Sequence, residues 1–151
     1  MFVRLQQGRF DPGAEIGAFL KGREATGAIV TFTGTVRSSP DRPVESLTLE
    51  HYPELAHPQV ERIAREAIDR FGLADLGVIH RFGTLKRGEV IVMVLALAAG
   101  RQAAFEAASF VMDYLKTDAP FWKKELSPGG EAWVEARHSD DAARAKWQKR
   151  K

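Results

Sequence analysis

The stretch Val90-Ile-Val-Met-Val-Leu-Ala-Leu-Ala98 is a continuous run of apolar residues. It has the length of a β-strand and falls far below the ~20 residues of a membrane-spanning helix. A strand that carries no polar residue on either face is typical of a central strand buried on both faces. We therefore expect Val90–Ala98 to lie at the centre of a sheet, with the other elements packed around it.

Long helices are predicted on both sides of this run along the chain. After Gly100-Arg101, apolar residues recur at three- and four-residue spacing until Lys116, and Pro120 ends the helix soon afterwards. Before the run, the same spacing from Pro58 predicts a helix that Gly72 closes in the usual left-handed cap position. The expected core stripe of the later helix is Phe105, Ala108, Met112 and Leu115, with Ala104, Ala107 and Val111 beside it and Phe110 and Tyr114 as further core candidates.

Shorter elements complete the expected fold. Asp11-Pro12 predicts the start of a short helix, with Asp11 as N-cap and an end near Gly22. Gly34 predicts a bulge or a close backbone approach within its strand. Because strands and helices mix without regular alternation, the predicted class is α+β. The other expected elements are strands at residues 2–7, 28–37, 44–52 and 76–82, turn-rich segments at 38–43 and 83–88, a hairpin of Phe121–Leu126 with Trp133–Arg137, and a helix over Asp140–Gln148.

Composition limits the classes of protein to consider. The 151 residues have the usual size of one domain, and they include no cysteine, which excludes disulfides and thiolate sites within this chain. The N-terminus lacks the apolar run of a signal peptide, so we expect a soluble, cytoplasmic protein. The net charge is +2, and much of the excess lies in Lys146, Lys149, Arg150 and Lys151. Such a cluster is typical of a solvated helix end, and a nucleic-acid-binding module would need a wider basic face.

The common catalytic and cofactor motifs are missing. The sequence has no dinucleotide-binding or phosphate-binding glycine loop, no zinc-protease motif and no serine nucleophile elbow. His51, His57, His80 and His138 show no metal-ligand spacing, and we interpret all four as structural residues. No metal and no cofactor are therefore expected.

Lysines and arginines remain as candidates for chemistry. Lys116 at a helix end offsets the helix dipole, and Lys123 on a strand can simply face solvent, so each has an ordinary structural interpretation. Their joint pattern also allows a functional interpretation, because a helix, a proline break and a returning strand can bring both lysines to one place. Arg37 ends a strand before a loop, and Arg101 begins a helix whose free N–H groups favour an anion. From the residues alone, the prediction is an α+β domain with a possible anion site.

Several segments resemble one family in order and over most of the chain. The longest and most specific is Phe105–Glu125, FEAASFVMDYLKTDAPFWKKE, which we expect to form the centre of the active site. The others are Val30–Arg37 (VTFTGTVR), Leu47–Pro53 (LTLEHYP), Ile79–Gly83 (IHRFG) and Trp133–Arg137 (WVEAR). Together they resemble the large, catalytic subunit of molybdopterin synthase, the MoaE family.

The resemblance implies a fold, an activity and a partner. The fold would be an α/β hammerhead with an additional small antiparallel β subdomain, formed by residues 1–151 as a single domain with a helical tail over 138–151. The activity would be sulfur transfer to cyclic pyranopterin monophosphate, forming the dithiolene of molybdopterin. The sulfur would arrive as a thiocarboxylate on the C-terminal Gly-Gly tail of a small ubiquitin-like, MoaD-like subunit. A homodimer would form the centre of a heterotetramer, without nucleic acid or membrane.

The resemblance also assigns roles to residues. Lys116 and Lys123 match the family's two important lysines, with Lys116 nearest the incoming glycine carboxyl group and Lys123 assisting substrate binding or proton transfer. Arg37 and Arg101 match anion-site arginines, Arg101 acting across the dimer. The remaining matches are substrate-site positions Thr35, Val36, Gly100, Lys124 and Glu125 and supporting positions Phe32, Met112 and Arg137.

One departure and one alternative accompany this assignment. Many relatives have histidine where this chain has Gly100, so no imidazole can act at that position here. The alternative function is a non-catalytic scaffold that binds a ubiquitin-like partner, with the lysines serving only as docking charges.

Overall fold

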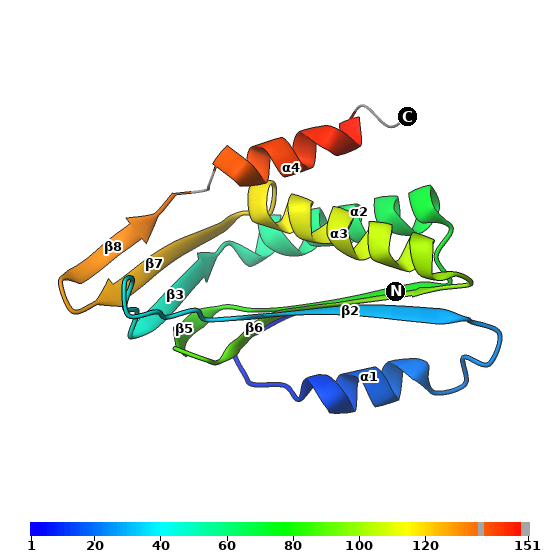
Figure 1. Cartoon of the computed structure of the whole chain (residues 1–151), viewed down its shortest axis with the longest axis horizontal. Helices are drawn as coiled ribbons and strands as arrows, with labels where there is room; N and C mark the ends of the chain where they lie inside the picture. Colours follow the sequence, from blue (N-terminus) through cyan, green and yellow to red (C-terminus); the bar gives the residue numbers. More distant parts are fainter. Residues whose placement is uncertain (136–137, 149–151) are drawn as a thin grey trace.

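The computed structural model describes residues 1–135 and 138–148, which form two β-sheets and the helices that cover them (Figure 1). The body sheet has the strand order β1-β4-β6-β2, and the end sheet has the order β5-β3-β7-β8. The body strands are β1 (Phe2–Gln6), β2 (Ala28–Thr35), β4 (Asp75–Arg81) and β6 (Val90–Ala98). The end strands are β3 (Ser46–His51), β5 (Gly83–Lys86), β7 (Phe121–Ser127) and β8 (Gly130–Val134).

The body sheet is covered on both faces. Helices α2 (Pro53–Phe71) and α3 (Arg101–Thr117) lie on one face, and α1 (Pro12–Leu20) lies on the other (Figure 1). Along β6, Val92 and Val94 pack toward α2 and α3, whereas Met93 and Leu95 pack toward α1. The prediction of a central strand buried on both faces is confirmed, since β6 lies between β4 and β2.

The end sheet projects from one end of the body. All of its neighbouring strands are antiparallel, and β4 leads into it through Phe82 and Gly83, whose φ of 86° lets the chain turn from one sheet to the other. Mixed helices and strands confirm the α+β class, and the end sheet is the additional antiparallel subdomain of the expected hammerhead. The turn predicted over Gly83–Gly88 is wrong in its first half: Gly83–Lys86 pairs with β3, because the fully buried Leu85 anchors a short strand.

The helix boundaries agree in part with the predictions. The Asp11 side chain accepts a hydrogen bond from the Ala14 N–H at 2.8 Å, as expected for the N-cap of α1. Helix α2 ends at the left-handed Gly72 as predicted, but it begins at Pro53 and contains Pro58. No helix within residues 1–135 and 138–148 has the length and apolar composition needed to cross a membrane.

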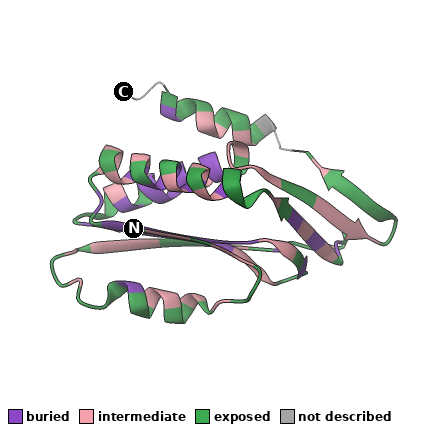
Figure 2. Cartoon of the chain, turned by 180° about the vertical axis from the view of Figure 1, so that it is seen from behind, coloured by how far each residue is buried: buried purple, intermediate pink, exposed green. Residues whose placement is uncertain are grey.

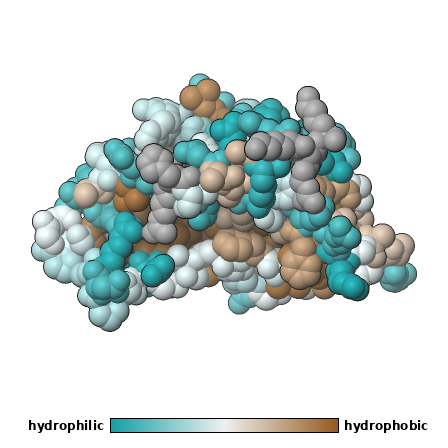
Figure 3. Space-filling model, turned by 45° about the horizontal axis from the view of Figure 1, so that its top comes forward, coloured by the Kyte–Doolittle hydropathy of each residue, from teal (hydrophilic) through white to brown (hydrophobic). Residues whose placement is uncertain are grey.

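The predicted core stripe of α3 is confirmed except at Phe105, because Ala108 and Leu115 are buried and Met112 packs against the core of the body. Phe105 is 63% exposed, so its expected place in the core is wrong, whereas Ala104, Ala107 and Val111 are fully buried. Phe110 is also fully buried and Tyr114 nearly so. Figure 3 shows hydrophobic side chains among the hydrophilic ones on one face of the molecule. The small alanine side chains face the sheet, which lets α3 approach it closely.

The C-terminal helix α4 (His138–Gln148) is packed on α3, not left as a solvated tail. Trp147 is only 3% exposed, contacts Phe71 and Phe110 edge to face, and donates from Nε1 to Asp113 at 2.8 Å. Lys146 is ion-paired with the same carboxylate at 2.9 Å. Of the basic cluster expected at a solvated helix end, Lys146 lies on this anchored helix with its side chain about half exposed, and Lys149, Arg150 and Lys151 lie outside the described residues.

Candidate active site

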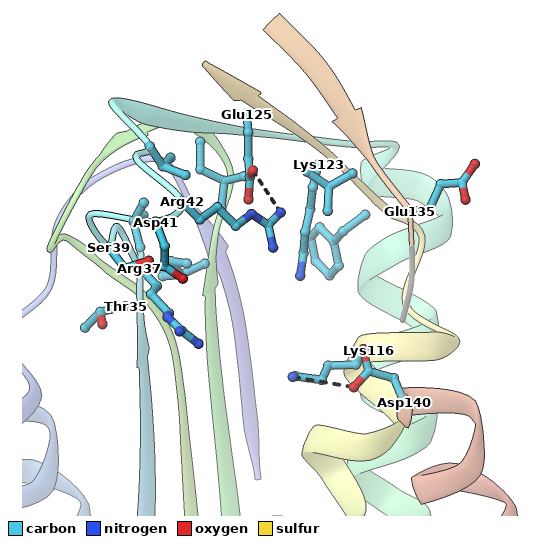
Figure 4. Close-up of a pocket in the computed structure, with 16 residues that line it drawn as sticks. Thr35, Arg37, Ser39, Asp41, Arg42, Lys116, Lys123, Glu125, Glu135 and Asp140 are labelled. Carbon is cyan, nitrogen blue, oxygen red and sulfur yellow. Dashed lines mark hydrogen bonds and ion pairs between the residues drawn. The ribbon is translucent and has the colours of Figure 1, made fainter. Parts of the chain in front are cut away.

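A cavity of about 420 Å³ lies between the end sheet, the loop after β2 and the C-terminal end of α3 (Figure 4). Its walls come from segments far apart in the sequence, so only the folded chain assembles it. Val36, Val44, Leu47, Ile91, Phe121 and Val134 supply its apolar surface. Its polar lining consists of Thr35, Arg37, Ser39, Asp41, Arg42, Lys116, Lys123, Glu125, Glu135 and Asp140.

Lys116 and Lys123 reach this cavity from different elements. Lys116 lies in the last turn of α3, and the chain then passes Pro120 and returns as β7. On β7, Lys123 pairs in register with Leu49 of β3, whose side chain is buried on the same side of the sheet. The convergence predicted from the helix, the proline break and the returning strand is observed.

Neighbouring residues of β7 divide between the two faces of the end sheet. Lys123 and Glu125 line the cavity, whereas Lys124 lies on the opposite face. There the Lys124 ammonium is 2.5 Å from Glu131 and lies over the Trp133 ring. The hydrogen bond that it donates to Glu131 raises the pKa of Lys124 above its ordinary value.

The loop after β2 forms the opposite wall as an ordered turn. Ser39 and Arg42 exchange two backbone hydrogen bonds of 3.1 Å, and Ser38 Oγ accepts from the Val44 N–H at 2.9 Å. The hydrogen bond from Ser39 lowers the pKa of the Asp41 carboxyl group, and Arg37 adds to this effect. The turn thus presents two arginines, Arg37 and Arg42, at the cavity (Figure 4).

Two of the cavity cations are held by carboxylates of the same chain. Arg42 donates to Glu125 at 3.1 Å across the cavity, and Lys116 lies 3.7 Å from Asp140 of α4 (Figure 4). The Arg42 and Lys116 side chains are about half exposed, so an incoming anion can compete for them without opening the core. The arrangement is suited to binding anions and to giving or accepting protons.

Aromatic rings pack against Phe121 at the cavity wall. Phe121 stacks on the buried His80 with ring centres 4.1 Å apart, and His51 lies at 5.9 Å on the same ring. Burial, with smaller effects of the nearby charges of Lys123 and His51, lowers the pKa of His80 to about 4. Its Nδ1–H donates to the Arg81 carbonyl at 2.9 Å, because a carbonyl can only accept. The prediction of a hydrogen-bonded structural histidine is confirmed for His80.

Some of the predicted site residues meet in this cavity and some do not. Those that line it are Thr35, Val36, Arg37, Lys116, Lys123 and Glu125. Lys124 is on the other face of the sheet, Phe32 is partly exposed on β2 away from the lining, and Met112 packs against the core of the body. The Phe105–Glu125 stretch therefore contributes only Lys116, Phe121, Lys123 and Glu125. Arg137 lies outside the described residues.

Gly100 and Arg101 lie at the far end of α3. Seventeen residues separate the two ends of this helix by about 25 Å at 1.5 Å per residue. Gly100 instead lines a shallow hollow with Arg70 and Phe71. Neither Gly100 nor Arg101 can reach the cavity of its own subunit.

Sequence reasoning missed Arg42, Glu135 and Asp140. Arg42 lies in a turn-rich loop and Asp140 in the first turn of a helix, where acidic residues are ordinary. The only available signal was that Arg42 shares a short loop with Arg37. Within the described ranges, no three side chains of the metal-binding types His, Asp and Glu gather closely enough to hold an ion.

Comparison with known proteins gives a consistent result. The model of the MoaE protein family matches residues 5–118. The molybdopterin synthase catalytic subunit of Rhizobium meliloti is 48% identical over 150 residues, covering 98% of this chain and 96% of the relative. The molybdopterin biosynthesis MoaE protein from Burkholderia ambifaria superimposes with a TM-score of 0.82 at 46% identity, covering 97% of both chains.

A more distant structure shares the fold. It is a protein–protein complex of subunits 1 and 2 of the molybdopterin-converting factor from Helicobacter pylori, with a TM-score of 0.75 and 23% identity over 89% of this chain and 91% of that chain.

Proposed function

Since the chain belongs to the MoaE family of molybdopterin synthase catalytic subunits, we propose that it transfers sulfur from the C-terminal thiocarboxylate of a small ubiquitin-like subunit to cyclic pyranopterin monophosphate. The product is the dithiolene of molybdopterin. The relative from Helicobacter pylori, solved as a complex of two subunits, supports a partner of this kind.

The observation that carries the proposal is the convergence of Lys116 and Lys123 on one cavity that also receives Arg37 and Arg42. Both reactants are anions, a thiocarboxylate and a phosphate, and lysine and arginine are the side chains that bind them. In our proposal Lys116 neutralises the tail, Lys123 assists proton transfer, and Arg37 holds the phosphate. The chain has no cysteine, so the sulfur stays on the partner until it is transferred.

Each transfer exchanges one oxygen of the substrate for one sulfur. The thiocarboxylate sulfur forms a bond to a substrate carbon, the carbon–oxygen bond breaks, and a lysine supplies the proton that the leaving oxygen requires. Water then cleaves the resulting thioester, which leaves sulfur on the substrate and a carboxylate on the tail. The exchange is balanced without an oxidant or a reductant, and two tails supply the two sulfurs.

Arg101 fits this proposal only as a residue of a second copy. It lies at the opposite end of α3 from Lys116, so an antiparallel homodimer would be needed to bring it to the neighbouring cavity. With one small subunit on each cavity, the assembly would be a heterotetramer. Analytical ultracentrifugation of the mixed subunits tests this stoichiometry.

The decisive experiment combines this protein, a thiocarboxylated small subunit and cyclic pyranopterin monophosphate, and follows the dithiolene product by mass spectrometry. We expect product with the native chain and little with Lys116→Ala, although both bind the small subunit. Full product with Lys116→Ala would show that Lys116 is not catalytic, and binding of the small subunit without any product from the native chain would favour the scaffold function. No product from a folded chain with a competent partner would refute the proposal.

A further inference from the structure

His80 lies where the body sheet meets the end sheet. It is near the end of β4, whose residues are all buried, whereas those of β7 and β8 are exposed or partly buried (Figure 2). Side chains alternate between the two faces of a strand, so His80 lies on the same face as Leu76 and Val78. Those two residues pack with α2 and α3 in the core of the body. His80 is therefore held by the packed body of the molecule.

The His80 ring stacks on Phe121, the first residue of β7. The two ring centres are 4.1 Å apart and the ring planes differ by only 10°. Phe121 also packs against the core of the body, and His51, its partner across the β3–β7 pair, lies with its ring centre at 5.9 Å. The start of β7 is thus fixed to the body through the contact between two flat rings.

A hydrogen bond sets the orientation of the His80 ring. Its Nδ1–H donates to the Arg81 carbonyl at 2.9 Å, which determines the plane in which the imidazole lies. Burial lowers the pKa of His80 to about 4, so the ring is neutral at neutral pH and adds no second positive charge beside Lys123. A neutral ring of fixed orientation can stack on Phe121 without repelling the lysine.

The position of Phe121 affects that of Lys123. The two residues are two positions apart on β7, so they lie on the same face of the strand, and both line the cavity. Lys116 extends into the same cavity from α3, which packs on the body (Figure 4). The chain leaves α3 at Thr117 and enters β7 at Phe121, so Phe121 is the first point at which the returning strand can be held. The distance between the two lysines therefore depends on how β7 is held against the body.

We propose that His80 is a positioning residue for the sulfur transfer, because its stack on Phe121 holds β7 where Lys123 and Lys116 meet at one cavity. This inference rests on the proposed function and adds a residue that does not itself line the cavity. A displacement of a reacting group by about 1 Å can slow a reaction about 100-fold, so the support of Lys123 matters for the rate. Binding of the anions, which several cations share, depends on it less.

Variants of His80 separate this role from that of an ordinary core residue. His80→Leu fills a similar space without a flat ring, and His80→Phe keeps a ring that can stack on Phe121. Val78→Ala shortens a fully buried side chain on the same face of β4 and serves as the control for lost packing. The measurements are the single-turnover rate of dithiolene formation and the KM for the pterin phosphate. Urea unfolding gives the conditions under which each variant is folded.

We expect His80→Leu to slow the single turnover about tenfold or more and to change KM by less than about threefold. His80→Phe should retain the native rate within about threefold, and folded Val78→Ala should have the native rate. A native rate for His80→Leu, or equal losses for His80→Leu and His80→Phe, would overturn the inference. So would a loss of the same size in Val78→Ala.

A double-mutant cycle tests whether His80 acts through Lys123. If it does, adding His80→Leu to Lys123→Ala should slow the remaining reaction by less than about twofold, because the lysine that His80 positions is already absent. A tenfold loss in both backgrounds would overturn the inference while leaving the sulfur transfer intact. No product from the folded native chain with a competent small subunit would contradict both proposals.

Discussion

The body sheet and the end sheet are both four-stranded, but they differ in what their faces contact. In the body, β6 is apolar on both faces and is buried between α1 on one side and helices α2 and α3 on the other. In the end sheet, β7 has one face around a cavity with charged walls and another that carries Lys124 and Trp122. The body therefore supplies most of the buried apolar area, while the end sheet can keep charged side chains exposed at little cost to stability.

This difference predicts opposite responses to substitution. Removing atoms from the body should reduce stability and leave the chemistry of the folded fraction unchanged. Removing charges from the cavity should reduce activity and leave the fold unchanged.

Leu95→Ala should give the largest change in stability. Leu95 is fully buried between β6 and α1, so its loss leaves a cavity and should reduce the free energy of unfolding by about 2–5 kcal/mol. Urea unfolding followed by circular dichroism measures this. Leu55→Ala, which removes the same atoms from an exposed site on α2, should stay within about 0.5 kcal/mol. Similar losses for the two variants would show that the division is wrong.

Lys116→Ala should give the complementary result. We expect dithiolene formation to slow about 10²- to 10³-fold, the usual loss when one charge-stabilising donor is removed. Its ion pair with Asp140 is half exposed, so unfolding should change by less than about 1 kcal/mol. Lys21→Ala, an exposed lysine directly after α1, is the matched control for both measurements. A Lys116 variant with reduced stability but an unchanged rate of dithiolene formation would show that this residue stabilises the fold and does not take part in the chemistry.

His80 is buried where the body meets the end sheet, and it should make the free energy of unfolding depend on pH. Its pKa is about 4 when folded and about 6.5 when unfolded, so the unfolded chain takes up the proton first as pH falls. The contribution of the neutral His80 to the free energy of unfolding is fully present above pH 6.5. As the pH falls toward 4, this contribution decreases by on the order of 3 kcal/mol.

His80→Phe keeps an aromatic ring against Phe121 and removes the titrating group. The free energy of unfolding of this variant should therefore vary less between pH 6.5 and pH 4 than that of the native chain. Denaturant unfolding at a series of pH values measures the difference. Parallel pH profiles for the two proteins would contradict the assignment of a buried neutral imidazole.

Arg42→Ala should have the smallest effect. Its ion pair with Glu125 is about half exposed, so stability should change by less than about 1 kcal/mol. If Arg42 exchanges this carboxylate for the substrate phosphate, the KM for the pterin phosphate should rise about tenfold while kcat changes less. Arg42→Lys should restore part of the binding. An unchanged KM would remove Arg42 from the anion site.

The two regions also differ in how far the sequence could predict them. The unbroken apolar run of β6 has the length of a strand and avoids water only when both of its faces are buried. The glycine after α2 specifies the left-handed cap of that helix. Strand β5 could not be predicted, because a four-residue segment with one buried leucine has no periodicity to detect. Phe105 was misplaced because the buried side of α3 carries Ala104, Ala107, Ala108, Val111 and Leu115, and Phe105 lies outside it.

The candidate site was predictable only in part for a related reason. Lys116 and Lys123 could be linked through Pro120, since one short connection joins their elements. Arg42 and Asp140 reach the cavity through long-range packing, which depends on the end sheet and on Trp147 anchoring α4. Pairing of this kind leaves no local pattern in the sequence.

We propose that the cavity face of β7 is the face that performs sulfur transfer. Lys123 and Lys124 are adjacent on one strand and differ in the face that they occupy, so Lys123→Ala and Lys124→Ala share the same backbone context. The measurement is the single-turnover rate of dithiolene formation for both variants with the same thiocarboxylated small subunit. We expect a loss of about 100-fold or more for Lys123→Ala and less than about threefold for Lys124→Ala. Equal losses, or a larger loss for Lys124→Ala, would contradict it.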